Sequence, residues 1–342
     1  MRAPMGLHLA YVSRADDPAV RAAEVLGIAS FDPPAAVGAS NGIPMAQIHT
    51  PVLPRAAPVY EVWSAGSPAA SGQRGRVHFR RTDEVLFGCI AIAEAEVDPA
   101  PGATALQAAT AAAYAELCAT LETEDYPHLL RVWNYLPDIN RDSNGTERYR
   151  QFNAARQHAL QAHGRALTGS VPAASALGAE SASPLVVYFL AGRTAPHFIE
   201  NPRQVSAYHY PPEYGTHSPV FSRAALLKQP GSTTLFISGT ASIVGHRSLH
   251  VGDTVAQTRE TVSNIKALLA EANRRAGQRA FELSSLAYKV YVRRPADLPV
   301  IERTLAEELG PAQLLYLQAD ICRQDLLVEI EATGIQSLAK AA

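Results

Sequence analysis

Short apolar runs alternate with longer amphipathic stretches along the chain. The short runs are rich in β-branched and aromatic residues and end at Gly, Pro or charged residues, which is typical of β-strands. They cover residues 85–92, 185–190, 234–238, 286–292 and 326–330. The longer stretches place apolar residues at helical spacing and predict helices over residues 104–121, 147–163, 254–275 and 296–309. We therefore expect a mixed α and β chain.

The order of these predicted elements in the first half of the sequence is repeated in the second half. Similar residues occur at positions 86–88 and 235–239, 106–107 and 256–257, 130–133 and 288–291, and 137–138 and 295–297. The offset is about 150 residues and grows to 158 after the helix, as one loop insertion would produce. A duplicated strand-helix-strand-helix unit explains this pattern. Coincidence also explains it, because few patterns of apolar residues exist and unrelated α/β segments often share them.

The length of 342 residues favours two domains. We predict an N-terminal unit over residues 1–165 and a C-terminal catalytic unit over residues 166–342. Residues 167–184 lie between the two and are rich in Ala, Ser, Gly and Pro, which is typical of a flexible connector.

Charge and cysteine content restrict the partners and the compartment. The formal net charge of -2 gives no overall attraction to nucleic-acid phosphates. Cys89, Cys118 and Cys322 form neither a CxxC pair nor a disulfide framework, which favours a reducing cytoplasm. Neither a cleavable leader nor an apolar run of membrane-spanning length occurs in the sequence, so we expect no membrane partner. A monomer and a small homo-oligomer both remain open.

Familiar cofactor motifs do not occur in the sequence. It has no P-loop, no GxGxxG after a strand, no GxSxG and no HExxH. Four histidines gather in one region, but they form no close metal-type pair: His209, His217, His246 and His250. We therefore predict chemistry without a metal and without a cofactor.

Two glutamates share one face of the predicted C-terminal strand. In residues 325–331 (DLLVEIE), the period of two places Glu329 and Glu331 on one side, and Val328 and Ile330 on the other. This face either meets solvent or lines a dry pocket, and the residues alone leave both open. In a dry pocket, desolvation would raise the pKa of a glutamate and keep it protonated as a general acid.

Arginines gather in two places. Arg148, Phe152 and Arg156 follow one another at i, i+4 spacing on the predicted helix 147–163, and guanidinium groups bind carboxylates in bidentate geometry. Arg203 and Arg223 flank the aromatic residues Tyr208, Tyr210, Tyr214 and Phe221. Arginine with aromatic residues is typical of a pocket for a flat anion, although a solvated basic face and an ordinary interface have the same composition.

Residues of the second half resemble the Rid (reactive intermediate deaminase) fold. The resemblance covers residues 210–335 and rests on 218–224 (SPVFSRA), 236–239 (FISG), 256–258 (AQT), 264–266 (NIK), 311–312 (PA) and 328–332 (VEIEA). It implies an α/β (α+β) fold of two Rid-like units with mixed sheets packed by helices, arranged like part of a trimer. Gln313 stands where the deaminases have a carboxylate-binding arginine, which argues against imine hydrolysis.

The longer chain is similar to the chorismatases, including the 3-hydroxybenzoate synthases. The similarity spans roughly residues 85–335 and rests on six motifs in the same order: 131–137 (RVWNYLP), 147–152 (ERYRQF), 172–176 (PAASA), 186–189 (VVYF), 200–204 (ENPRQ) and 238–242 (SGTAS). The third motif lies in the predicted connector and replaces that interpretation.

The resemblance implies a reaction and its residues. Glu329 would protonate the enolpyruvyl methylene of chorismate, and Cys322 matches the cysteine of the type that forms an aromatic product. Arg148, Arg156 and Arg223 are the expected carboxylate ligands. Four further positions complete the expected substrate site: Tyr149, Tyr208, Gly239 and Ala241.

The expected products are 3-hydroxybenzoate and pyruvate, and 4-hydroxybenzoate stays open as a second aromatic product. His217 stands where the resemblance leads us to expect arginine, which affects the expected partition of products. Three alternatives stay open: a chorismate hydrolase that forms a dihydroxycyclohexadiene carboxylate, a Rid-type imine hydrolase, and a non-catalytic protein that binds a metabolite.

Overall fold

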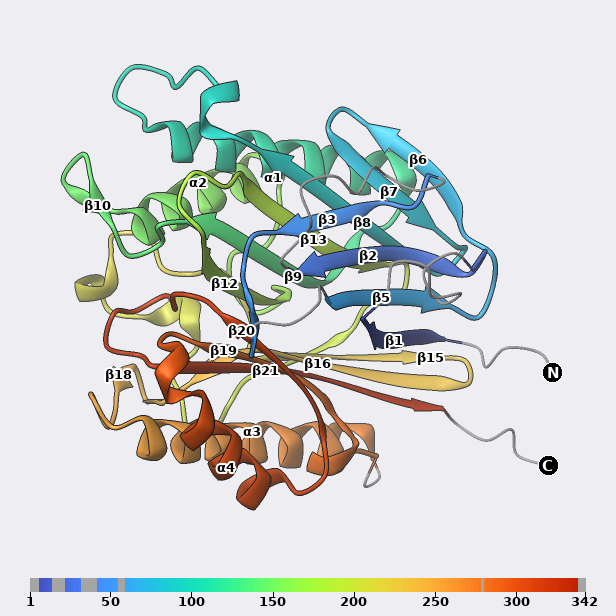
Figure 1. Cartoon of the computed structure of the whole chain (residues 1–342). Helices are drawn as coiled ribbons and strands as arrows, with labels where there is room; N and C mark the ends of the chain where they lie inside the picture. Colours follow the sequence, from blue (N-terminus) through green and yellow to red (C-terminus); the bar gives the residue numbers. More distant parts are fainter. Residues whose placement is uncertain (1–5, 14–21, 32–41, 55–58, 278–279, 338–342) are drawn as a thin grey trace.

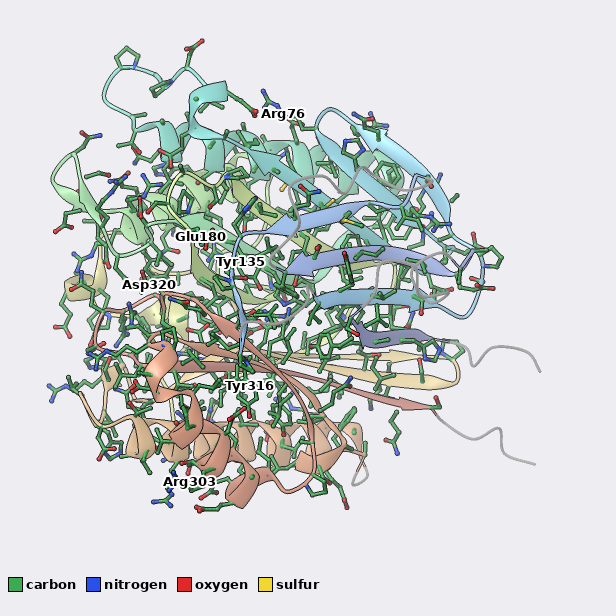
Figure 2. All side chains as sticks on the ribbon, in the orientation of Figure 1. Arg76, Tyr135, Glu180, Arg303, Tyr316 and Asp320 are labelled. Carbon is green, nitrogen blue, oxygen red and sulfur yellow. The ribbon has the colours of Figure 1, made fainter. Side chains whose placement is uncertain are left out.

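Three β-sheets and four α-helices account for most of the chain in the computed structural model, which describes residues 6–13, 22–31, 42–54, 59–277 and 280–337. Helices α1 and α2 lie at one end of the molecule and helices α3 and α4 at the opposite end, with the sheets between them (Figure 1). The fold is thus a stack of helix, sheet, sheet and helix layers, and side chains fill the space between the sheets (Figure 2).

The six-stranded sheet has the order β12-β9-β13-β8-β7-β6. Its strands are β6 (Ala70–Arg74), β7 (Val77–Arg81), β8 (Val85–Ile92), β9 (His128–Pro137), β12 (Ala173–Ala179) and β13 (Leu185–Gly192). Only β12 and β9 run parallel; the other pairs are antiparallel. The strands β8, β9 and β13 are buried on both faces, which explains their nearly continuous apolar sequences.

Helices α1 (Ala105–Glu124) and α2 (Arg148–Ala162) cover the outer face of this sheet. Thr104 begins α1 with a capping box, since its side chain accepts from the backbone N–H of Gln107 and the Gln107 side chain accepts in return. The buried stripe of α1 recurs at helical spacing and packs into the core beneath both helices.

The seven-stranded sheet has the order β14-β15-β16-β21-β19-β20-β4. Its strands are β4 (Val52–Leu53), β14 (His197–Ile199), β15 (Ala224–Gln229), β16 (Ser232–Ala241), β19 (Ala287–Val292), β20 (Gln313–Gln318) and β21 (Val328–Ser337). Helices α3 (Thr254–Ala276) and α4 (Leu298–Leu309) cover its outer face. Asp253 caps the start of α3, and Gly277 ends it at a φ of 80° that favours glycine.

A four-stranded sheet and two small hairpins complete the described chain. The sheet has the order β1-β5-β2-β3, with β1 (Leu7–Val12), β2 (Val25–Phe31), β3 (Met45–Ile48) and β5 (Val59–Ala65). The hairpins are β10 (Asp142–Ser143) with β11 (Thr146–Glu147), and β17 (Ile243–Val244) with β18 (Arg247–Ser248). One hydrophobic core lies among all three sheets, with Trp63, Trp133 and Phe236 coming from one sheet each.

The predicted fold class is confirmed. The order β8, α1, β9, α2 in the first half is repeated as β16, α3, β19, α4 in the second half, and helices pack both large sheets. The four predicted helices occur within a few residues of their expected bounds. Three sheets around one core also agree with the expected trimer-like arrangement.

One local prediction is corrected. The last strand is Val328–Ser337 rather than 326–330. The carbonyl of Leu326 accepts from the Arg293 side chain, and the N–H of Leu327 donates to the Gln257 side chain, so neither group pairs with a neighbouring strand. Residues 173–179 form strand β12, in agreement with the family motif that replaced the connector interpretation.

The division at residue 165 stays a prediction. It falls between α2 and β12, and the six-stranded sheet crosses it, since β12 and β13 pair with strands from before the boundary. The outermost ends of the two ranges, residues 1–5 and 338–342, lie outside the described residues. Within the described ranges, none of the helices is long and apolar enough to cross a membrane. The expected cytoplasmic location stays a prediction.

Candidate active site

Strand β21 carries two buried glutamates on one face. Glu329 and Glu331 are each 4% exposed, so this face lines the interior and the solvated alternative is wrong. Glu329 lies opposite Ala241 of β16 and opposite Tyr291 of β19 in the two neighbouring pairings. The central place of β21 in the seven-stranded sheet thus brings Glu329 between residues of both flanking strands.

A cavity of about 600 Å³ leads to Glu329, a volume typical of small-molecule sites. Its wall combines α2, the segment before β15, strand β16 and the loop before β21. Its lining includes Tyr149, Tyr210, Tyr214, Phe221, Arg223, Gly239, Ala241, Cys322, Arg323 and Glu329. A small adjoining cavity at the Glu329 end adds Arg156 and Ser175 to the lining.

The two glutamates of β21 have opposite protonation states at neutral pH. Burial raises the pKa of Glu329 to about 8, and the negative charge of Glu331 adds to the rise. The pKa of Glu331 is lowered to about 2, because Lys289 and Arg131 outweigh the effect of its burial. Glu329 is therefore a neutral acid, and Glu331 is a carboxylate.

Gly239 gives the Glu329 carboxyl group its space. The pairing of β16 with β21 shifts between Ile237 and Thr240, so Gly239 lies in a bulge. A Cβ on Gly239 would collide with Oε1 of Glu329. The backbone N–H of Gly239 donates to Ser175 Oγ at 3.0 Å, which fixes the bulge against β12.

Cys322 lies beside the acid on the loop before β21. Its Sγ is 4.0 Å from Oε2 of Glu329, and burial raises the pKa of its thiol to about 12. Arg293 holds this loop, donating from Nε to the carbonyl of Leu326 at 2.6 Å and from Nη2 to the carbonyl of Arg323 at 2.8 Å. Cys322 is thus a neutral thiol in a fixed position.

Four arginines line the cavity and its small extension: Arg150, Arg156, Arg223 and Arg323. Arg223 donates from Nη2 to Tyr210 Oη at 2.8 Å, and Arg156 donates from Nη2 to the carbonyl of Val220 at 3.1 Å. The guanidinium of Arg323 lies 4.0 Å from the ring centre of Tyr214. Arg156, Arg223 and Arg323 each keep one buried nitrogen without a partner among the described residues: Nε of Arg156, Nε of Arg223 and Nη2 of Arg323. Guanidinium groups with unused donors suit an anionic ligand.

Comparisons with known proteins identify the family of the chain. The family described as "Chorismatase FkbO/Hyg5-like, N-terminal" matches residues 61–191. The chain is 37% identical over 303 residues to a 3-hydroxybenzoate synthase of Streptomyces hygroscopicus, a match that covers 85% of each chain. It is 39% identical over 297 residues to a chorismatase of the same organism, which covers 85% of this chain and 83% of that one. The chain belongs to the chorismatase family.

A solved structure extends this similarity to the whole fold. A chorismatase crystal structure matches this chorismatase-family chain with a TM-score of 0.87 and 34% identity. The match covers 97% of this chain and 99% of that chain. The family resemblance inferred from the sequence motifs is thus confirmed.

Most of the predicted site residues meet around one cavity. Glu329, Cys322, Tyr149 and Gly239 line both the large cavity and its small extension. Arg223 and Ala241 line the large cavity, and Arg156 lines the extension. The structure therefore brings together residues that the sequence places on five separate segments.

Arg148 and Tyr208 are placed away from the cavity. Arg148 is the first residue of α2, where it forms an ion pair with Glu94 and donates to the carbonyl of Pro137 at 2.9 Å. Tyr208 packs against the core beneath α1 and α2 and against His209. The substrate role predicted for these two side chains is therefore not supported, because other partners already occupy them.

The two departures from the expected motifs lie outside the cavity lining. The ring of His217 meets His158 edge-on, with 4.9 Å between the ring centres. Gln313 is exposed at the start of β20. Neither residue is placed to contact a ligand beside Glu329.

Several residues of the site escaped the sequence analysis. Arg323 directly follows Cys322, and Ser175 lies within the motif 172–176, so their neighbours in sequence could have marked them. Arg131 is the first residue of the motif 131–137 and could have been marked in the same way. Lys289 lies in none of the six motifs, and a single charged residue in an apolar strand has no periodic pattern of its own.

Proposed function

We propose that this protein converts chorismate to 3-hydroxybenzoate and pyruvate. Chorismate carries two carboxylates, a ring hydroxyl and an enolpyruvyl ether, so its site must bind two anions and deliver one proton. The observation that carries the proposal is the neutral Glu329 at the end of a cavity that four arginines border. A protonated carboxyl group beside unpaired guanidinium nitrogens matches both requirements.

Glu329 donates its proton to the terminal methylene carbon of the enolpyruvyl group. The ether carbon then becomes cationic, and the bond between the ring and the ether oxygen weakens. The neighbouring ring hydroxyl attacks the ring carbon, pyruvate leaves, and the resulting arene oxide opens to 3-hydroxybenzoate. The hydroxyl group loses one proton and the methylene carbon gains one from Glu329, so the number of protons is unchanged. The reaction therefore needs no water and no oxidant. General acid catalysis typically contributes about 10²–10⁴-fold to such a rate.

The groups around Glu329 orient the substrate. Arg223, Arg156 and Arg323 each have a nitrogen without a partner among the described residues. In the proposed complex their guanidinium groups bind the carboxylates, and this binding fixes the methylene against the acid. Cys322 occupies the space beside Oε2 of Glu329 as a neutral thiol, which keeps water away from the cationic carbon. Exclusion of water favours the internal attack over hydrolysis.

The test combines two measurements on the purified protein with chorismate. Pyruvate is followed by a coupled lactate dehydrogenase assay, and the ring product is separated by chromatography. We expect equal amounts of pyruvate and 3-hydroxybenzoate, loss of both in Glu329→Gln, and full activity in Glu124→Gln, which removes a surface ion-pair partner of Arg74 and Arg81.

Each other result selects a different function. A dihydroxycyclohexadiene carboxylate in place of the aromatic product identifies a chorismate hydrolase. Chorismate binding without pyruvate release identifies a binding protein. Hydrolysis of an enamine from a dehydratase, with chorismate untouched, identifies an imine hydrolase. A 4-hydroxybenzoate peak would add a second aromatic product.

A further inference from the structure

Four buried charges lie behind Glu329 and take no part in the proposed proton transfer. They are Glu331 of β21, Lys289 of β19, Arg131 of β9 and Glu61 of β5, and none is more than 4% exposed. Nζ of Lys289 lies 2.7 Å from Oε2 of Glu61 and 2.8 Å from Oε1 of Glu331. Nη2 of Arg131 lies 2.7 Å from Oε2 of Glu331. We call these four residues the buried ion cluster.

Glu331 is the most heavily bonded member of the buried ion cluster. In addition to its two ion pairs, its carboxylate accepts from Trp133 Nε1 and Ser175 Oγ, both at 2.7 Å, and from Tyr291 Oη at 3.1 Å. Hydrogen bonds and opposite charges both favour the ionised form of a carboxyl group. The surroundings of Glu331 therefore keep it negative although water is excluded.

The charges of the buried ion cluster balance one another, and neither of its two cations forms an ion pair with Glu329. Two carboxylates face two cations, so the net charge of the cluster is zero. Within the described chain, Glu329 forms no ion pair, although it shares a face of β21 with Glu331. Ser175 joins the two sites, because its Oγ donates to Glu331 and accepts from the N–H of Gly239, against which Glu329 packs.

We propose that Glu331 is a positioning residue whose fixed negative charge keeps the proton on Glu329. Arg131 and Lys289 keep Glu331 ionised, and Glu61 holds Lys289 in place. This inference rests on the proposed role of Glu329 as the proton donor. It assigns a function to buried charges that burial alone makes costly.

The positive groups near Glu329 oppose the effect of its burial, and the charge of Glu331 acts with that burial to keep the proton. Arg131, Arg223 and Arg293 all lower the pKa of Glu329. Further groups face it from the other elements that line the cavity: Arg156 and Tyr149 of α2, and Cys322 and Arg323 of the loop before β21. The arginines that bind substrate would therefore favour ionisation of the acid. A carboxylate that is already negative opposes them, because two carboxyl groups on one face do not both ionise readily.

The experiment follows the protonated carboxyl of Glu329 by infrared difference spectroscopy across pH. The band is assigned by its absence in Glu329→Gln, so the readout does not depend on turnover. In the wild type we expect its midpoint near pH 8. In Glu331→Gln we expect the midpoint, and the alkaline limb of kcat, to fall by about one pH unit or more.

Two further variants make the test specific. Glu61→Gln removes the distant carboxylate of the buried ion cluster and should lower the midpoint by a smaller amount, since charge effects weaken with distance. Glu94→Gln removes the partner of the buried Arg148 outside the cluster and should leave the midpoint unchanged. Should Glu331→Gln fail to fold, the comparison between Glu61→Gln and Glu94→Gln carries the test.

An unchanged midpoint in Glu331→Gln, or in Glu61→Gln when that variant carries the test, overturns the inference. Failure of the proposed function looks different: Glu329→Gln then keeps its turnover, while the infrared midpoints still report whether Glu331 controls the proton of Glu329.

Discussion

Arg131 and Lys289 occupy equivalent positions in the two repeated halves, and both bind the carboxylate of Glu331. Arg131 lies on β9 and Lys289 on β19, the strands that follow the first helix of each half. Their nitrogens approach opposite oxygens of Glu331 at 2.7 Å and 2.8 Å. The site therefore forms where the two halves meet, and each half supplies one cation to it.

The pH dependence of stability offers a test of the neutral state of Glu329. A carboxyl group whose pKa is raised by folding stabilises the fold at low pH, and this contribution is lost as pH rises towards the folded pKa of about 8. Glu329→Gln does not titrate. We therefore expect the difference in unfolding free energy, variant minus wild type, to increase by about 1.4 kcal/mol per pH unit between about pH 5 and 8.

Urea unfolding of the two proteins at several pH values measures this difference. Above about pH 8 the difference should level off. A difference that stays constant across the range would show that Glu329 is ionised in the folded protein.

Gly239→Ala tests the space around the acid. The added Cβ collides with Oε1 of Glu329, so the carboxyl group must move while the strand pairing persists. A displacement of about 1 Å at a reacting group costs about 10²-fold in rate. We expect a loss of kcat of this order with a melting temperature within a few degrees of the wild type. Unaltered kinetics in a folded variant would show that Gly239 does not position Glu329.

Arg223→Met should weaken substrate binding, whereas Arg148→Met should lower the stability of the fold. Arg223 lines the cavity and its Nε has no partner among the described residues, whereas Arg148 is bound to Glu94 and Pro137. A hydrogen bond to a charged group contributes about 1.5–3 kcal/mol, so we expect the KM for chorismate to rise about 10–100-fold in Arg223→Met. Arg148→Met should instead lower stability with KM close to that of the wild type. Steady-state kinetics and thermal melting separate the two, and the reverse pattern would restore the role expected of Arg148 from the sequence.

Arg293 hydrogen-bonds the loop that carries Cys322. Three carbonyls of the loop, those of Ile321, Arg323 and Leu326, accept from the Arg293 guanidinium. In the wild type the raised pKa and the fixed loop should make the Cys322 thiol slow to react with a disulfide reagent. Arg293→Gln should increase the labelling rate at least about tenfold and shift part of the product to the diol, as water enters. Equal labelling rates would show that the loop is held by other contacts.

The acid and its strand were predictable from sequence because a period of two places Glu329 and Glu331 on one face. This period could not show which of the two keeps its proton, and the choice of Glu329 rested on the family resemblance. The charges that favour ionisation of Glu331, Lys289 and Arg131, come from strands about 40 and 200 residues away in sequence. Helical spacing placed Arg148 on a face of α2 but could not show that a residue of the first turn reaches back to Glu94. The start of β21 was misplaced because Leu326 and Leu327 are apolar, yet Arg293 and Gln257 bind their backbone groups.

Turnover of chorismate in D₂O tests the central claim most directly. The proton that Glu329 delivers comes from solvent, so pyruvate trapped at once as lactate should carry one deuterium in its methyl group. Glu329→Gln should release no pyruvate under the same conditions. Wild-type pyruvate without deuterium, or full turnover by Glu329→Gln, would contradict proton transfer by this carboxyl group.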